Sequence, residues 1–162
     1  MRTEQDILEM IGRALREKEA QRQRAAQRLA EEIEARRVFL QAARAVFTHI
    51  VVPEMERFSA ILQQARMRPT VSDTGAFYLP GASDATLIAR FALPLLRDQV
   101  ELPLSVCFEA VFPVGIAVYF GDVEADRTQA RGEVEEVPLE NMTRDLVEDR
   151  LVRVLENYLH EL

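Results

Sequence analysis

Residues 13–52 read RALREKEAQRQRAAQRLAEEIEARRVFLQAARAVFTHIVV. The stretch contains neither Gly nor Pro and is dense in Ala, Gln, Arg, Glu and Leu, which are strong helix formers. It therefore predicts one long helix, which the rest of a 162-residue chain is too small to cover. Because a helix in water depends on a partner for its apolar face, we expect this one to mediate contacts between chains.

Apolar residues along the helix recur at steps of three and four, which is the helical period. Seven residues separate Ile33, Leu40 and Phe47, whereas eleven separate Leu29, Leu40 and Val51, so one strict heptad is not expected. We predict a coiled-coil-like homodimer, and the pattern leaves the direction of the two helices open. The residues predicted to form the dimer interface or the core are Leu29, Ile33, Leu40, Phe47, Ile50, Val51 and Phe58.

Between Val38 and Val52 apolar residues occupy almost every face of the helix, which is typical of a helix buried on all sides. Pro53 disfavours helical geometry at Val52 and predicts either a kink or a break before a second helical segment. We therefore expect two domains: residues 1–68 as a long helical rod with a kink or break near Pro53, and residues 69–162 as a small α+β head.

After Pro69 the sequence period changes from that of a helix to that of a strand. Residues 70–84 have a loop composition, with one short strand expected at Phe77–Leu79. Alternating apolar residues then predict a small antiparallel meander, since strands this close together lack the crossovers of a parallel sheet. Its three to four strands are Ala85–Leu93, Leu102–Phe112, Ile116–Phe120 and a more polar edge strand at about Gln129–Val137.

Residues 112–115 read FPVG and fit a turn between two of these strands. The predicted hairpin pairs Phe112 with Ile116, Ala110 with Val118, and Phe108 with Phe120. Pro138 ends the last strand, and a helix capped by Asn141 or Thr143 then runs to the chain end. Its predicted apolar face is Val147, Leu151, Val154, Leu155, Tyr158, Leu159 and Leu162. The predicted fold class is α+β, with a long N-terminal helix, the meander and a C-terminal helix.

The net charge of −7 is unevenly divided. Residues 1–68 carry 13 Lys and Arg against 10 Asp and Glu, whereas the remainder carries 7 against 17. The basic segment, residues 13–28, holds six Lys and Arg against two Glu and predicts, as an alternative function, a nucleic-acid-associated dimer. The segment has no aromatic residue to stack on bases, and the head is acidic, so we favour an arm that is either solvated or part of a coil held by charge pairs.

Few residues point to chemistry. Cys107 is the only cysteine, and the only two histidines, His49 and His160, have no motif around them, so we expect no catalytic, cofactor or metal site. Asp122, Glu124, Asp126 and Glu133 have the spacing of a calcium loop, but Arg127 stands where such a loop needs Gly. Arg90 and Glu109 are expected to form a cross-strand ion pair on the outer face of the sheet. A second alternative function is a small-ligand or enzyme domain with its pocket near the 70–84 loop, because long loops are often functional.

The N-terminus, MRTEQDILEM, has no apolar signal core, and Thr3 with Asp6 predicts a helix cap instead. The longest apolar run, Ala110–Phe120, is too short to span a bilayer as a helix. We expect a cytoplasmic protein that contacts itself and another protein, of adaptor, chaperone or structural-stalk type. The order of elements is similar to the general plan of several dimeric bacterial proteins, among them secretion chaperones, nucleoid-associated proteins and stalk subunits of rotary ATPases. This is a likeness of architecture that no motif carries.

Overall fold

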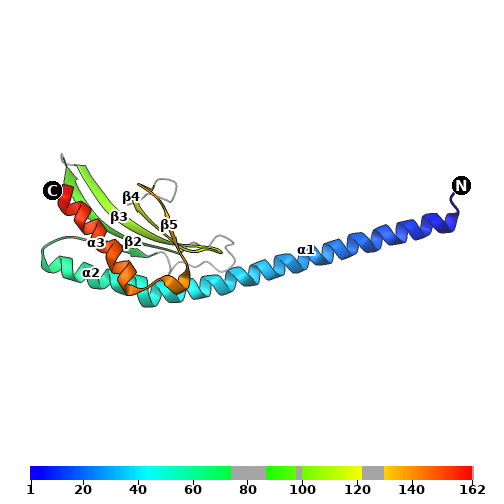
Figure 1. Cartoon of the computed structure of the whole chain (residues 1–162), viewed down its shortest axis with the longest axis horizontal. Helices are drawn as coiled ribbons and strands as arrows, with labels where there is room; N and C mark the ends of the chain where they lie inside the picture. Colours follow the sequence, from blue (N-terminus) through cyan, green and yellow to red (C-terminus); the bar gives the residue numbers. More distant parts are fainter. Residues whose placement is uncertain (74–86, 98–99, 122–129, 162) are drawn as a thin grey trace. The chain divides into compact units, whose positions relative to one another are not determined.

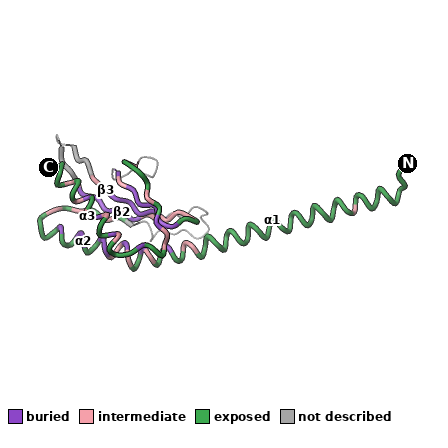
Figure 2. Tube along the Cα trace, viewed as in Figure 1, coloured by how far each residue is buried: buried purple, intermediate pink, exposed green. Residues whose placement is uncertain are grey.

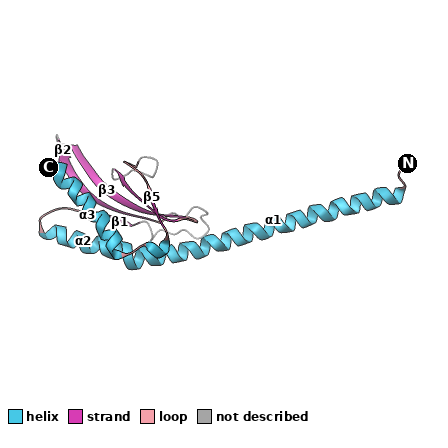
Figure 3. Cartoon of the chain, in the orientation of Figure 1, coloured by secondary structure: helices cyan, strands magenta, loops and turns pink. Residues whose placement is uncertain are grey.

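The computed structural model describes residues 1–73, 87–97, 100–121 and 130–161 (Figure 1). It confirms the α+β class, with a long N-terminal helix, an antiparallel sheet and a C-terminal helix (Figure 3). The sheet has five strands rather than three to four. The helical elements are α1 (Glu4–Val46), η1 (Phe47–Val51), α2 (Val52–Gln64), η3 (Leu139–Asn141) and α3 (Arg144–Glu161). The strands are β1 (Thr70–Asp73), β2 (Ile88–Arg97), β3 (Val100–Val111), β4 (Gly115–Gly121) and β5 (Glu135–Val137).

The chain divides into two compact units, Met1–Val38 and Phe39–Leu162. The second unit contains the end of α1, both shorter helices that pack on the sheet, and the sheet itself. The domain boundary that the sequence predicts between residues 68 and 69 stays a prediction.

Helix α1 begins with the capping pair that the sequence predicts. The Thr3 backbone N–H donates to Oδ2 of Asp6 at 3.0 Å, and the Asp6 N–H donates to Oγ1 of Thr3 at 3.2 Å. These two bonds satisfy N–H groups that have no partner within the helix, which sets the helix start at Glu4. The hydrogen bonds from Thr3 also hold the pKa of the Asp6 carboxyl below its ordinary value.

The helical backbone continues through Pro53 without a break, because a π-helical turn precedes it. Pro53 has no N–H, and its ring would clash with the carbonyl four residues earlier in a regular α-helix. The π-helical turn η1 widens the helix at this point, and the Val52 N–H donates to the carbonyl of Phe47. Helix α2 then starts at Val52, with Pro53 in its first turn, where a missing N–H costs little.

The five strands form an antiparallel meander in the order β1-β2-β3-β4-β5. β1 lies in the segment predicted to be a loop, and that prediction is wrong for these four residues. Their polar composition resembles a loop, but hydrogen bonds to β2 make them an edge strand. The short strand predicted at Phe77–Leu79 lies outside the described residues. β5 is confined to Glu135–Val137, the end of the predicted fourth strand.

The predicted register of the β3–β4 hairpin is wrong by two residues. The structure pairs Ala110 with Ile116, Phe108 with Val118, and Val106 with Phe120. The turn spans Val111 to Val114, whose N–H donates to the Val111 carbonyl at 2.9 Å, and Gly115 already belongs to β4. A Cβ at Gly115, where φ is +142°, would lie 2.2 Å from the Val137 carbonyl oxygen, so this position needs glycine. A shift of two residues keeps the same side chains on the same face.

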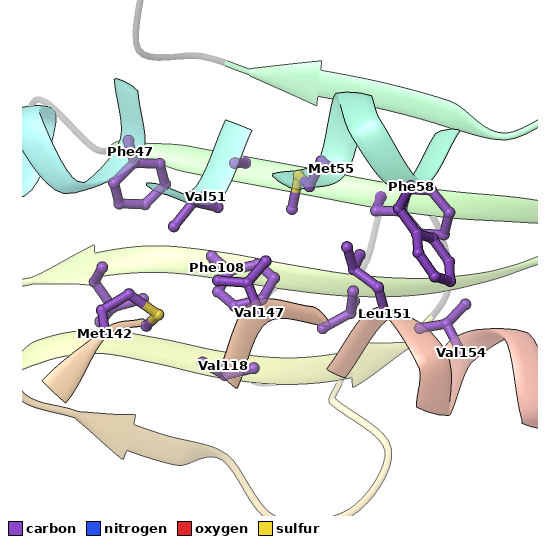
Figure 4. Close-up of a cluster of buried hydrophobic side chains, with 14 of the residues drawn as sticks. Phe47, Val51, Met55, Phe58, Phe108, Val118, Met142, Val147, Leu151 and Val154 are labelled. Carbon is purple, nitrogen blue, oxygen red and sulfur yellow. The ribbon is translucent and has the colours of Figure 1, made fainter. Parts of the chain in front are cut away.

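The core lies between one face of the sheet and the helices α2 and α3 (Figures 1 and 4). Its helical side chains include Phe47, Val51, Met55, Phe58, Val147, Leu151 and Val154, and its strand side chains include Phe91, Phe108 and Val118. The rings of Phe58 and Phe91 pack edge to face, with 5.6 Å between the ring centroids.

Helix α3 follows the predicted pattern over its first three turns. Of the two predicted caps, Thr143 accepts the Leu146 N–H through Oγ1 at 3.2 Å. Val147, Leu151 and Val154 are buried, Leu155 and Tyr158 are half-buried, and Leu159 is exposed. Leu162 lies outside the described residues.

Candidate interaction surface

Five large apolar side chains of α1 lie exposed on one side of the Met1–Val38 unit. We call them the α1 stripe: Ile7, Ile11, Leu15, Leu29 and Ile33. Their exposed fractions lie between 45% and 61%. At 3.6 residues per turn the five positions fall within an arc of about 80° on the helix. Every residue of this unit except Gly12 is exposed, so no part of the unit covers the stripe (Figure 2).

Basic side chains interrupt the α1 stripe at its middle. Lys18 and Arg22 fall on the same arc of the helix, between the apolar residues of the first turns and those near its end. Ala25 also lies on the arc and adds a small apolar surface. The stripe therefore consists of two apolar patches with a basic centre.

Exposed ion pairs follow the basic segment along α1. Glu32 pairs with Arg36 at 3.3 Å, and Glu34 pairs with Arg37 at 2.7 Å. The hydrogen bonds from Arg37 lower the pKa of the Glu34 carboxyl. Pairs at these spacings stabilise a helix by only ~0.3–0.5 kcal/mol each in water. They support the helix locally, and residues 13–28, with six Lys and Arg against two Glu, keep a net charge of +4.

The residues predicted for the dimer interface or the core occupy three environments. Leu29 and Ile33 are exposed in the Met1–Val38 unit. Leu40 and Ile50 are half-buried and pack against the core of the second unit. Phe47, Val51 and Phe58 are buried in that core. The structure therefore separates residues whose apolar spacing in the sequence is the same.

The sheet face away from α2 and α3 carries a row of polar side chains, in which sequence reasoning identified Arg90 but not its neighbours Cys107 and Tyr119. Register places Arg90 opposite Cys107, and Cys107 opposite Tyr119, across three strands. The Arg90 Nε donates to the Cys107 Sγ at 3.0 Å, and both Cys107 and Tyr119 are buried. Burial, together with the neighbouring Cys107 and Glu109, raises the pKa of the Tyr119 hydroxyl. Only the strand register brings Cys107 and Tyr119 beside Arg90, so no short motif could have predicted this row.

Arg90 and Glu109 both belong to this polar face, as the sequence predicts. Glu109 stands opposite Ile88 and Arg90 opposite Cys107, so the two are diagonal neighbours rather than directly opposed. Their predicted ion pair stays a prediction. Two residues before Cys107 on β3, the Ser105 hydroxyl donates to the Gly121 carbonyl at 2.7 Å.

The described residues do not assemble a nucleophile with a base. Cys107 is buried on the polar face of the sheet, whereas His49 in η1 and His160 in α3 are exposed on elements that pack against the other face. Within the described ranges no three His, Cys, Asp or Glu side chains form a group that could hold a metal ion. Glu133 is exposed, and the other members of the calcium-loop pattern, at 122–126, lie outside those ranges. Residues 74–84 of the predicted functional loop lie outside them as well.

A depression near the start of α1 is lined by Arg2, Asp6, Glu9, Met10 and Arg13. All of these residues come from the first turns of one helix and its cap, so they cannot enclose a ligand. Among the described helices none combines the length and the apolarity that crossing a bilayer requires. The cytoplasmic location stays a prediction.

Comparison with protein-family models, with curated proteins and with solved structures finds no match to this chain. Within the Met1–Val38 unit Leu8, Met10 and Val38 are exposed as well, but the five residues of the α1 stripe share one arc of the helix.

Proposed function

We propose that this protein is a non-enzymatic interaction protein that forms a homodimer through the Met1–Val38 part of α1. The observation that carries the proposal is the exposure of all five residues of the α1 stripe on one arc of a helix. A helix in a protein gains most of its stability from packing its apolar face, and contiguous exposed apolar residues are typical of an interaction site.

The expected strength of the contact follows from the area left to bury. Transferring a whole Leu or Ile side chain from water contributes ~1.5–3 kcal/mol, and these side chains are about half exposed, so each contributes ~1 kcal/mol. Ten such side chains from two copies contribute ~10 kcal/mol, against an association cost of ~4–15 kcal/mol. We therefore expect a reversible dimer that depends on protein concentration.

The Phe39–Leu162 unit gives the proposed dimer a second, different surface. That unit carries 11 Lys and Arg against 19 Asp and Glu, a net charge of −8. Acidic surfaces attract basic partners and repel phosphates. An adaptor, chaperone or stalk role, in which this unit contacts a basic surface of another protein, fits that charge better than a nucleic-acid partner does.

The proposal is tested by placing charge in the stripe. The variant Ile11→Asp with Leu29→Asp puts two carboxylates at the expected contact, and sedimentation velocity should then give a monomer at concentrations where the wild type is a dimer. The matched control, Ala20→Asp with Gln27→Asp, adds the same charge on the opposite side of the helix and should sediment as the wild type does. Equal dissociation by both variants would mean that charge alone, and not the stripe, controls assembly.

A further inference from the structure

The stripe and its charged interruptions form a pattern that is symmetric about residue 20. Isoleucine stands at 7 and 33, Ile11 corresponds to Leu29, Leu15 to Ala25, and Lys18 to Arg22. The pattern extends to the ends of the stripe, where Glu4 corresponds to Arg36. In each pair the two residue numbers add to 40. Reversing the direction of the helix therefore superimposes apolar on apolar residues, Lys18 on Arg22, and Glu4 on the oppositely charged Arg36.

This symmetry has a direct structural consequence for two copies of the helix. An antiparallel pair related by a twofold axis near residue 20 places Ile7 and Ile11 of one copy against Ile33 and Leu29 of the other. Glu4 then lies opposite Arg36 of the second copy, and the twofold axis repeats this opposite-charge contact at the other end. A closed, self-complementary contact of this kind ends at a dimer.

A parallel pair in register is disfavoured by its charges. It would set Glu4, Lys18, Arg22 and Arg36 each against the same residue of the second copy, which gives four like-charge contacts. The antiparallel pair replaces two of these by opposite-charge contacts and retains two like-charge contacts, in which Lys18 of each copy lies opposite Arg22 of the other. At that centre Glu19 of one copy comes within one position of Arg22 of the other, which offsets part of the repulsion.

The spacing of the pattern suits a pair with little supercoil. Between Ile7 and Arg36 one residue falls on the arc in each helical turn, over eight turns. The pattern therefore repeats about every 3.6 residues, which is the period of a straight α-helix. A heptad pattern would impose a left-handed supercoil, and this one does not. The part of each helix that makes the contact, from Ile7 to Ile33, is ~39 Å long.

We infer that the Met1–Val38 helices of two copies pair antiparallel, with Ile11 opposite Leu29 and the twofold axis near residue 20. The inference rests on the proposed homodimer and specifies its partner, direction and register.

Cross-linking of cysteine variants tests the direction. Ile11→Cys and Leu29→Cys are made in full-length chains that carry different tags, and each is purified alone and after co-expression with the other. In an antiparallel pair a short bifunctional maleimide should join Cys at 11 to Cys at 29 in the mixed dimer. It should not join either variant to itself, because like positions are ~27 Å apart along the helix. The wild type is the control, since its single cysteine, Cys107, is buried.

The outcomes separate this inference from the proposed function. Cross-links within each variant alone, with none added by mixing, would establish parallel helices and overturn the inference while leaving the homodimer intact. A dimer by light scattering that gives no cross-link in any sample would overturn the register. A monomer by light scattering at all concentrations would overturn the proposed function itself, and the inference with it.

Discussion

Replacing Phe47 with alanine should lower the stability of the fold, whereas replacing Ile33 should weaken the dimer, although both residues have the same apolar spacing in one helical sequence. The Phe47 side chain is 2% exposed and lies in the core beside Val51 (Figure 4), whereas Ile33 is 60% exposed. Removing a buried Phe side chain costs ~3–5 kcal/mol, the sum of lost transfer energy and a cavity. Domains of this size unfold with ~5–15 kcal/mol, so Phe47→Ala should remove about a third of the stability and lower the melting temperature by ~10–20 °C.

Ile33→Ala is the matched control for that experiment. It removes an exposed side chain and adds a better helix former, so its melting temperature should stay within ~3 °C of the wild type at equal protein concentration. It should instead weaken the dimer about tenfold or more, because the twofold axis removes the side chain twice. Thermal unfolding followed by circular dichroism gives the first quantity, and sedimentation equilibrium gives the second. A melting temperature of Phe47→Ala equal to that of Ile33→Ala would refute the assignment of Phe47 to the core.

Three further outcomes follow from single features of the structure. Burial raises the pKa of Tyr119, so the folded protein keeps the hydroxyl proton above the ordinary tyrosine pKa of about 10. The free energy of unfolding should therefore be unaffected by this group below that pH and fall by ~1.4 kcal/mol per pH unit above it. Urea unfolding from about pH 8 to about pH 11 should show this fall in the wild type, and Tyr119→Phe should show a smaller fall. Gly115→Ala should lower the free energy of unfolding by ~2 kcal/mol or more, because the added Cβ would collide with the Val137 carbonyl. Gly12→Ala should raise it by ~0.5–1 kcal/mol, because an added Cβ there meets nothing within 4 Å and the position lies inside a helix. Equal effects of the two substitutions in chemical denaturation would contradict this contrast. Nucleic-acid binding by residues 13–28 should be weak and steeply lost with salt, so submicromolar affinity in a gel-shift titration at physiological salt would make the alternative function the better one.

Most of the fold is predictable because each element has a strong local signal. Uninterrupted helix formers predict α1, alternating apolar residues predict β2, β3 and β4, and Pro138 with Thr143 marks the approach to α3. The misses are places where a local pattern competes with distant contacts. The polar residues 70–73 become a strand only through pairing with β2. Gly115 belongs to β4 rather than to the turn, and it lies beside the Val137 carbonyl of β5, which the FPVG pattern does not reveal.

The candidate surface is predictable only in part. Leu29 and Phe47 have the same kind of apolar spacing, and sequence alone does not reveal that one is exposed and the other buried. Burial depends on which part of α1 meets the sheet and α3, and that is decided by packing in the Phe39–Leu162 unit. The row of Arg90, Cys107 and Tyr119 depends in the same way on a register that spans three strands.

The most direct test of the proposed homodimer is the molar mass of the wild-type protein in solution. Size-exclusion chromatography with light scattering, over a series of concentrations through the micromolar range, should give twice the 18.5 kDa mass of the chain at the upper end and a fall toward that mass on dilution. A mass of 18.5 kDa at every concentration would contradict the proposal that the α1 stripe is covered by a second copy of the chain.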